Sequence, residues 1–277
     1  MRKLALVGFL LATSFSATQA QKWKKYEVQA DTLLGREQYQ QAAKLYGKSI
    51  QASKLKTDDA YNALYKRAVC YYYLDETSPA LADLEQFIKK FPRVYQSRLL
   101  RAFVYRDLGE TEKQLEDINV ALDLRPLDTD LMKWRASLYL ETEAFEKAIA
   151  DLDYVESVQN DPEVQMYKGY AYYGMNRIDD ALFFMKKAIE LDATYLAPYL
   201  YSGSFLLEKG EYEQALTYLN LALRLDPINL SAIFYKGVAL VELKQFDEGC
   251  SCLNKAFYGG EDGASDYLKE YCFGSPN

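Results

Sequence analysis

A small residue, Ala or Gly, recurs at a nearly constant interval along the whole chain, and this periodicity restricts the possible folds more than any other feature. Self-similarity at a period close to 34 residues indicates a stack of equivalent units that contact mainly their neighbours. The first series consists of Ala30, Ala68, Ala102, Ala136, Gly169, Gly203 and Gly237. A second series follows it 12 residues later and consists of Ala42, Ala80, Gln114, Ala148, Ala181, Ala215 and Gly249.

Each unit has the pattern of two short amphipathic helices. In the segment 196–229, Tyr199, Gly203 and Leu206 fall on one stripe of a helix. Gly210 stands where a helix-ending glycine is expected, and Pro227 stops a second helix. The apolar stripe of this second helix consists of Ala215, Leu219 and Ala222. The sequence therefore predicts one helix-turn-helix in each unit.

The pattern resembles the tetratricopeptide repeat (TPR), in which small residues at positions 8, 20 and 27 alternate with bulky ones at 4, 11 and 24 and a proline at 32. Gln114 at position 20 of the third copy and Phe87 at position 27 of the second depart from it. Residues 21–263 align as seven copies: 23–56, 61–94, 95–128, 129–162, 162–195, 196–229 and 230–263. The resemblance implies an all-α fold, a right-handed α-solenoid of about seven helix-turn-helix repeats. Residues 264–277 are expected to form a C-terminal capping helix, over 264–273, and a tail.

The first twenty residues have the composition of a secretory signal peptide. Basic Arg2 and Lys3 precede the apolar run Leu4–Phe15, and the small residues of Ala17–Ala20 follow. The alternatives are a buried N-terminal helix or an uncleaved anchor, although the apolar run is too short to span a bilayer comfortably. We expect cleavage after Ala20, no membrane insertion afterwards, and export to the periplasm or to the outside of a bacterial cell.

Composition argues against several classes of function. The chain contains no histidine, which excludes Ser-His-Asp and Cys-His catalysis and every histidine-bearing metal site. Its formal charge of -7 becomes more negative when the basic leader is removed, and such a chain without a basic run is not expected to bind nucleic acid. The acidic pairs Asp151/Asp153, Asp179/Asp180 and Glu116/Asp117 are expected to be solvated charges rather than acid–base pairs. No catalytic residue, metal or cofactor is predicted.

Four cysteines remain to be explained. Cys70 fits a buried small apolar position. Cys272 ends the expected capping helix, and Cys250 and Cys252 lie on the helix that it should contact, so export makes a disulfide plausible with either partner. The C-terminal sequence also resembles the cap of exported bacterial TPR proteins in which such cysteines pair, and this resemblance favours Cys250–Cys272.

In the TPR family, positions 2, 5, 9 and 12 of the first helix line a concave groove. The resemblance therefore predicts an unusually apolar and aromatic partner-binding surface. The alternative is that these side chains only fill the inside of a tight superhelix. The asparagines of the carboxylate-clamp subclass are absent, so that mode of binding is not supported. The predicted groove residues are Tyr65, Val69, Tyr72, Leu99, Phe103, Arg106, Met166, Tyr170, Tyr173, Leu200 and Phe234.

The resemblance implies a non-enzymatic scaffold that binds a protein or a peptide segment through this groove. One alternative is a structural or accessory subunit of a cell-envelope or secretion complex, which would use its ends or its convex face. A glycan binder or an enzyme that uses groove tyrosines and carboxylates is a further alternative.

Overall fold

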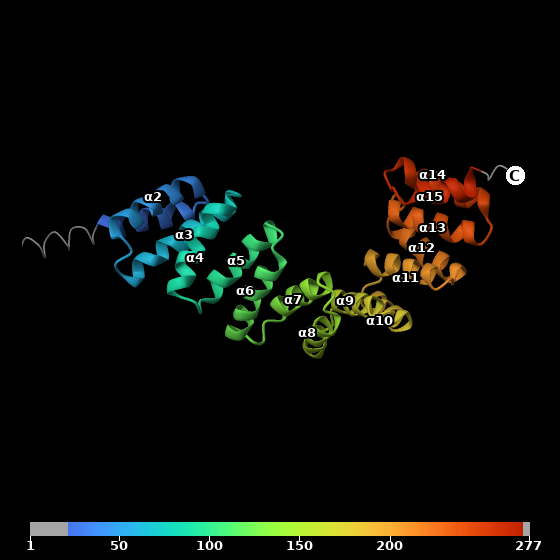
Figure 1. Cartoon of the computed structure of the whole chain (residues 1–277), viewed down its shortest axis with the longest axis horizontal. Helices are drawn as coiled ribbons and strands as arrows, with labels where there is room; N and C mark the ends of the chain where they lie inside the picture. The colour runs from blue at the N-terminus through green and yellow to red at the C-terminus, as the bar shows by residue number, and fades with distance from the viewer. Residues whose placement is uncertain (1–21, 274–277) are drawn as a thin grey trace, which may run out of the picture. The chain divides into compact units, whose positions relative to one another are not determined.

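The computed structural model describes residues 22–273, and these residues form helices and turns without any strand (Figure 1). Consecutive helices pack in pairs, as the two amphipathic stripes of each unit require. The chain divides into two compact units, and the boundary in the sequence lies between Asp128 and Thr129.

Unit 1 contains the first three helical pairs. The first helix covers 22–34. It is followed by α2 (Tyr39–Ser53), α3 (Asp58–Tyr73), α4 (Thr77–Lys90), α5 (Tyr95–Asp107) and α6 (Thr111–Leu124).

Unit 2 contains four further pairs and a C-terminal segment. The pairs are α7 (Thr129–Glu141) with α8 (Phe145–Val158), α9 (Pro162–Gly174) with α10 (Ile178–Leu191), α11 (Leu196–Glu208) with α12 (Tyr212–Leu225), and α13 (Leu230–Glu242) with α14 (Phe246–Tyr258). The expected capping helix begins at Ala264 as α15 (Ala264–Tyr267), but it continues as a wider π-helical turn, η1 (Leu268–Cys272). Leu268 is buried against the core of the last repeat, whereas Lys269 and Glu270 are exposed.

The same left-handed turn joins the two helices of every repeat. At position 15 the backbone φ is positive in all seven copies, and the next amide N–H donates to the carbonyl oxygen five residues earlier, as in Glu211 to Leu206 at 2.8 Å. Only Gly109 and Gly210 supply a glycine there. The other copies place Glu37, Asp75, Glu143, Asn176 and Lys244 in this conformation. Glycine at position 15 therefore indicates a left-handed turn, and the repeat adopts the same turn where another residue occupies that position.

The recurring small residues lie where the two helices of a repeat cross. A Cβ atom placed on Gly203 would lie 2.6 Å from the Cγ atom of Leu219, which is 16 positions further along the chain. A Cβ atom on Gly237 would likewise lie 2.9 Å from the Cγ atom of Leu253. Such distances allow no side chain, so glycine lets the helices approach until the leucine covers the first helix directly.

Buried ion pairs join the two helices of the second, third and fourth copies. In each copy an Arg at position 7 binds an Asp at position 23 through two nitrogens. The pairs are Arg67 with Asp83 (2.7 and 2.7 Å), Arg101 with Asp117 (2.6 and 2.8 Å) and Arg135 with Asp151 (2.7 and 2.7 Å). Asp117 also accepts from Arg98 at 2.8 Å. These bidentate contacts satisfy carboxylates that are otherwise removed from water.

This arrangement corrects the expectation that the acidic pairs are solvated. Asp117 is completely buried and Asp151 is nearly so, whereas Glu116, Asp153 and Asp179 are exposed as expected. The expectation fails at the two buried residues because a guanidinium 16 positions earlier in the chain compensates each carboxylate.

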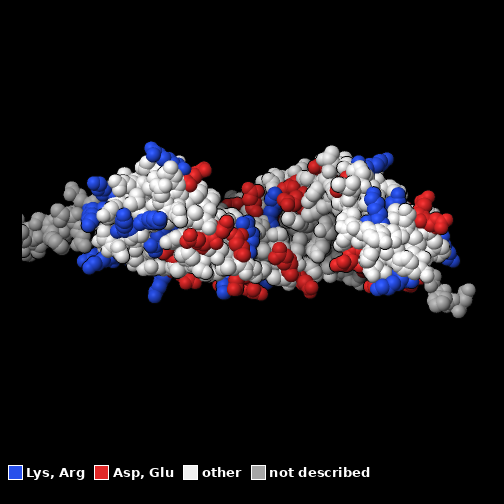
Figure 2. Space-filling view, turned by 90° about the horizontal axis from the view of Figure 1, so that it is seen from above, with Lys and Arg blue, Asp and Glu red and all other residues white. Residues whose placement is uncertain are grey.

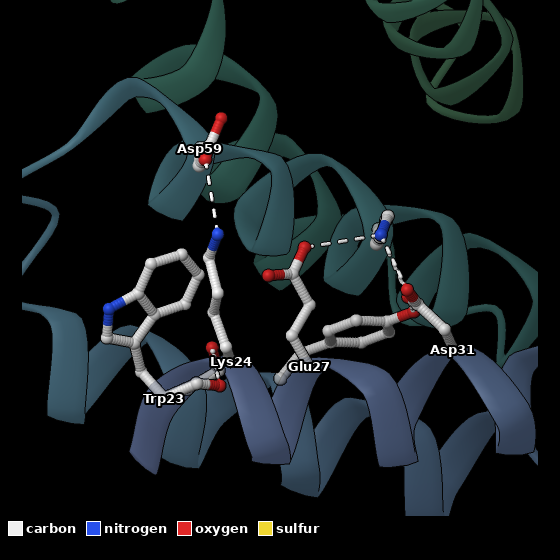
Figure 3. Close-up of polar contacts among 8 residues, drawn as sticks. Trp23, Lys24, Glu27, Asp31 and Asp59 are labelled. Atoms are coloured by element: carbon white, nitrogen blue, oxygen red, sulfur yellow. Dashed lines mark hydrogen bonds and ion pairs between the residues drawn. The ribbon is translucent and has the colours of Figure 1, made fainter. Parts of the chain in front are cut away.

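A polar network holds the first helix of unit 1 against α2 and α3 (Figure 3). The Lys66 ammonium donates to Glu27 at 3.2 Å and to both oxygens of Asp31 at 2.9 Å. The buried Tyr46 hydroxyl also donates to Asp31, at 2.6 Å. Partial burial opposes the charge on Lys66, yet the two carboxylates hold its pKa above the ordinary value. Ser49 donates to the backbone carbonyl of Trp23 at 3.0 Å and completes the attachment.

Replacing glycine by alanine should change stability in opposite directions at Gly203, which lies at the helix crossing, and at Gly47, which lies away from it. Gly203→Ala should lower the free energy of unfolding by about 1 to 2 kcal/mol, because overpacking against Leu219 outweighs the better helix propensity of alanine. Gly47→Ala should raise it by about 0.5 to 1 kcal/mol, since its Cβ would only make an ordinary van der Waals contact with the Arg67 guanidinium, at 3.4 Å. Urea titrations of both variants provide the measurement. An equal gain from both substitutions would show that the crossing at Gly203 can relax.

Candidate partner-binding groove

Unit 1 has an open cavity of about 460 Å³ between the first helices of its second and third repeats. Its walls come from α3 and α5, which run beside each other because their partner helices α4 and α6 occupy the other side of each pair. The lining side chains are Tyr65, Val69, Tyr72, Tyr73, Gln96, Leu99, Leu100 and Phe103. All but Leu100 are partly accessible, so the cavity is a ready apolar surface.

Aromatic contacts fix the walls of this cavity. The Tyr72 ring lies 6.3 Å from the Phe103 ring across the two helices. Tyr73 stacks on Tyr39 of α2 with ring centroids 4.7 Å apart. At the rim, the Arg106 guanidinium lies 5.1 Å from the Phe103 centroid and donates to the Tyr72 hydroxyl at 3.4 Å. These contacts therefore hold the rings of the cavity in fixed positions.

Unit 2 has a smaller cavity of about 270 Å³, also between first helices. It receives Ser137, Leu140 and Glu141 from α7, Met166, Tyr167 and Tyr170 from α9, and Tyr201 from α11. Tyr195, the residue that immediately precedes α11, donates to the sulfur of Met166 at 3.0 Å and so holds this side of the cavity.

The structure brings seven of the predicted groove residues into these two cavities. Arg106 stands at the rim of the unit 1 cavity. Three predicted residues, Tyr173, Leu200 and Phe234, line neither cavity. Tyr173 stacks on Phe205 with ring centroids 4.1 Å apart, and Leu200 packs against the core around Tyr199. Phe234 contacts Tyr267 of α15 edge to face, with ring centroids 5.8 Å apart. A hydrogen bond to Glu208, helped by burial, raises the pKa of Tyr173 to about 12. The seven lining residues are Tyr65, Val69, Tyr72, Leu99, Phe103, Met166 and Tyr170.

Sequence reasoning missed lining residues at repeat positions 6 and 13. Tyr73 and Glu141 occupy position 13, and Leu100, Tyr167 and Tyr201 occupy position 6. The signal was present, because position 13 follows position 9 by one helical turn and position 6 adjoins position 5 on the same stripe.

The structure joins Cys250 to Cys272 by a disulfide, with Cα atoms 5.6 Å apart, and thereby fastens η1 to α14. Cys252 remains a half-buried free thiol. Cys70 is fully buried, and this burial raises the pKa of its thiol to about 11, so it stays protonated at neutral pH.

Charge is unevenly distributed along the chain. Residues 22–57 contain eight Lys and Arg against three Asp and Glu, and Figure 2 shows the blue side chains gathered at that end of unit 1. Residues 129–163 of unit 2 contain nine Asp and Glu against three Lys and Arg. Within residues 22–273, no cluster of three or more acidic or cysteine side chains is arranged to hold a metal ion. In the same range, no helix combines the length and the apolar character that crossing a membrane requires.

Comparison with known proteins identifies the repeats. Family models described as tetratricopeptide repeat match residues 62–93, 163–195 and 199–229. The chain therefore carries tetratricopeptide repeats in both of its units. Its repeats make this TPR protein a scaffold for protein–protein interaction.

Solved structures with the same fold cover most of this TPR protein. A tetratricopeptide repeat protein from Parabacteroides merdae is 15% identical, covers 91% of this chain and 97% of its own, and has a TM-score of 0.64. The C-terminal part of a TPR repeat-containing protein from Cytophaga hutchinsonii is 20% identical, with coverages of 87% and 99% and a TM-score of 0.66. YrrB, described as a TPR protein with an unusual peptide-binding site, is 17% identical, with coverages of 68% and 97% and a TM-score of 0.51. A search of curated proteins found no significant sequence match.

Replacing a tyrosine that lines the unit 2 cavity should cost much less stability than replacing one that packs in the core. Tyr170→Ala should lower the free energy of unfolding by less than about 1 kcal/mol, because this ring is 38% exposed at the cavity. Tyr199→Ala should lower it by about 3 to 5 kcal/mol, because this ring is 7% exposed and fills the core. Both values come from urea titration monitored by circular dichroism. Similar large losses would mean that the Tyr170 ring is structural.

Proposed function

We propose that this TPR protein holds an extended or helical segment of a partner protein in the groove formed by its first helices. The observation that carries the proposal is the aromatic cavity of unit 1, where side chains from two successive repeats converge on an open apolar surface. Tyrosine and phenylalanine at such a surface provide large, rigid contact area at low entropic cost. A partner segment would bury these rings with its own apolar anchors.

Packing within the repeats is complete without the lining side chains. Ala68 and Leu84, at the crossing of α3 and α4, are fully buried, and so are Ala102 and Ile118 in the next repeat. Tyr65, Leu99 and Phe103 remain only half-buried. This contrast supports a binding role, since side chains that merely filled the stack would be buried to the same degree as its core.

The proposal includes export to the periplasm or to the outside of a bacterial cell. Its support is the leader-like sequence Met1–Ala20, which lies outside the described residues, together with the disulfide between Cys250 and Cys272. Disulfides persist in oxidising compartments. The half-buried Cys252 and the buried Cys70 would remain reduced.

Substitution in the groove tests the main proposal. The double variant Tyr65→Ala/Phe103→Ala should weaken capture of the native partner, identified by mass spectrometry of the envelope fraction, at least tenfold. The matched control is Phe183→Ala, which removes a ring that is 55% exposed on a second helix. Circular dichroism establishes that all variants are folded. Undiminished capture by the double variant would refute the groove.

A second candidate, an accessory subunit that docks through its second helices, has one specific observation in its favour. Position 30 of three successive repeats carries exposed aliphatic residues: Val158, Leu191 and Leu225. If capture survives the groove substitutions but is lost in Val158→Ser/Leu191→Ser, this second surface is the binding face.

Export and the disulfide give a combined prediction. Protein recovered from the native cell should begin at Gln21 and contain one disulfide, Cys250–Cys272, in its peptide mass map. Reduction, or Cys272→Ser, should lower the free energy of unfolding by about 3 kcal/mol, because the bond closes a loop across a separation of 22 residues. Cys252→Ser is the control and should change it little. An intact N-terminus with four free thiols would contradict export.

A further inference from the structure

The unit 2 cavity combines three tyrosine rings with one carboxylate. Tyr167 and Tyr170 project from α9, Tyr201 comes from α11, and Glu141 is the last residue of α7. The volume of about 270 Å³ is below that of most pockets for drug-sized molecules and corresponds to one long side chain.

The rings are held at angles that leave a π face accessible. The Tyr170 and Tyr201 centroids lie 5.8 Å apart with ring planes inclined at 65°, so the two rings form a corner rather than a closed stack. Tyr201 is backed by Phe205 at 5.9 Å. The Tyr167 hydroxyl donates to Glu163 at 3.1 Å, which fixes the third ring. The corner is therefore preorganised.

Glu141 is an exposed carboxylate that lacks a counter-ion. Within residues 22–273 no Lys or Arg pairs with it, and no basic side chain lines the cavity. The carbonyl end of α7 adds negative potential at the same place, because Glu141 ends that helix. The negative charge at the mouth of the cavity is thus uncompensated.

The basic residues of the neighbourhood are already engaged. Lys133 binds Asp161 at 2.8 Å and Glu163 at 3.2 Å, and Arg135 is held by Asp151. The Lys147 ammonium lies 5.6 Å from the centroid of the Tyr139 ring. The unit 1 cavity differs in this respect, because it has no acidic lining residue and Arg106 stands at its rim.

We infer that the unit 2 cavity is a subsite for a cationic side chain, arginine or lysine, of the segment bound in the groove. The aliphatic stem would lie against Leu140 and Met166, the charged head would lie over the tyrosine rings, and Glu141 would accept its hydrogen bonds. This inference rests on the proposed function, because it assigns one position of the partner segment.

Guest peptides test the inference. The host is the peptide acetyl-Gly-Leu-X-Leu-Gly-amide, in which X is arginine, lysine, citrulline, leucine or glutamate, and binding to the whole protein is measured by NMR titration. Citrulline keeps the shape of arginine and removes its charge. The arginine peptide should bind about tenfold more tightly than the citrulline peptide, and its advantage over the glutamate peptide should be at least as large. Raising the salt concentration from 50 to about 500 mM should shrink this preference, since the charge lies at the surface.

Variants of the protein test whether the preference for arginine over citrulline arises in the unit 2 cavity. Glu141→Gln and Tyr170→Leu should each reduce the arginine-over-citrulline ratio about threefold or more. Glu146→Gln is the matched control, because it makes the same change of charge at an exposed residue of α8 outside the cavity, and the ratio should stay unchanged.

The outcomes separate the inference from the proposed function. Equal binding of arginine and citrulline, or an equal fall of the ratio in Glu146→Gln and Glu141→Gln, would overturn the cationic subsite and leave the groove standing. Absence of binding by every guest would overturn the subsite as well, whereas the groove would still be judged by Tyr65→Ala/Phe103→Ala.

Discussion

The contact between position 8 of the first helix and position 24 of the second is the constraint on which each repeat depends. At Gly203 the backbone itself lies against Leu219, and at Ala68 only a methyl group separates the helices from Leu84. Interaxial distance follows the side chains at the crossing, so a small residue there draws the two helices together and buries position 24 completely. The same contact fixes which stripe of the first helix faces away from its partner helix. Positions 5, 9 and 13 fall on that stripe, and the groove is its consequence.

The repeats reinforce this contact in two different ways. Copies two to four have alanine at position 8 and a bidentate Arg–Asp pair at positions 7 and 23. Copies five to seven have glycine at position 8, and position 23 is Phe184, Tyr218 or Cys252. Buried ion pairs contribute little net stability, but a displaced register would leave a charge buried without its partner. We infer that the pairs specify the register in the earlier copies, and that shape complementarity against glycine does so in the later ones.

Much of the fold could be predicted from the sequence because each repeat carries its own helix signals. The small residues, the stripes and the turn at Gly210 are local features, and the structure has the expected helices around them. The burial of Asp117 was not predicted, because a lone Glu–Asp dipeptide is usually solvated and the partner of Asp117, Arg101, lies 16 residues earlier. Once several copies are aligned, however, the recurrence of Arg and Asp at this spacing is visible in the sequence itself.

The candidate site was only partly predictable, because neighbouring repeats decide which groove positions stay open. Phe103, Tyr170 and Val238 all occupy position 9, yet the first two line cavities, whereas Val238 is buried in the cluster that α15 and η1 help to form. Tyr173 occupies the predicted stripe, but Phe205 of the next repeat covers its ring. The sequence of one repeat defines a stripe; the side chains of the next repeat close or open it.

The two cavities differ in chemistry because different residues occupy equivalent positions of the same repeat. Position 13 is Tyr73 in the cavity of unit 1 and Glu141 in that of unit 2, and this difference places an aromatic ring in one lining and an unpaired carboxylate in the other. Arg106, at position 12 of the next repeat, adds positive charge at the unit 1 rim. Because the helix crossings depend on positions 8 and 24, these lining residues can differ in charge without disturbing the stack. The residues that hold the stack and those that line the cavities therefore lie on separate faces of the same helices, which lets one scaffold present two chemically distinct surfaces.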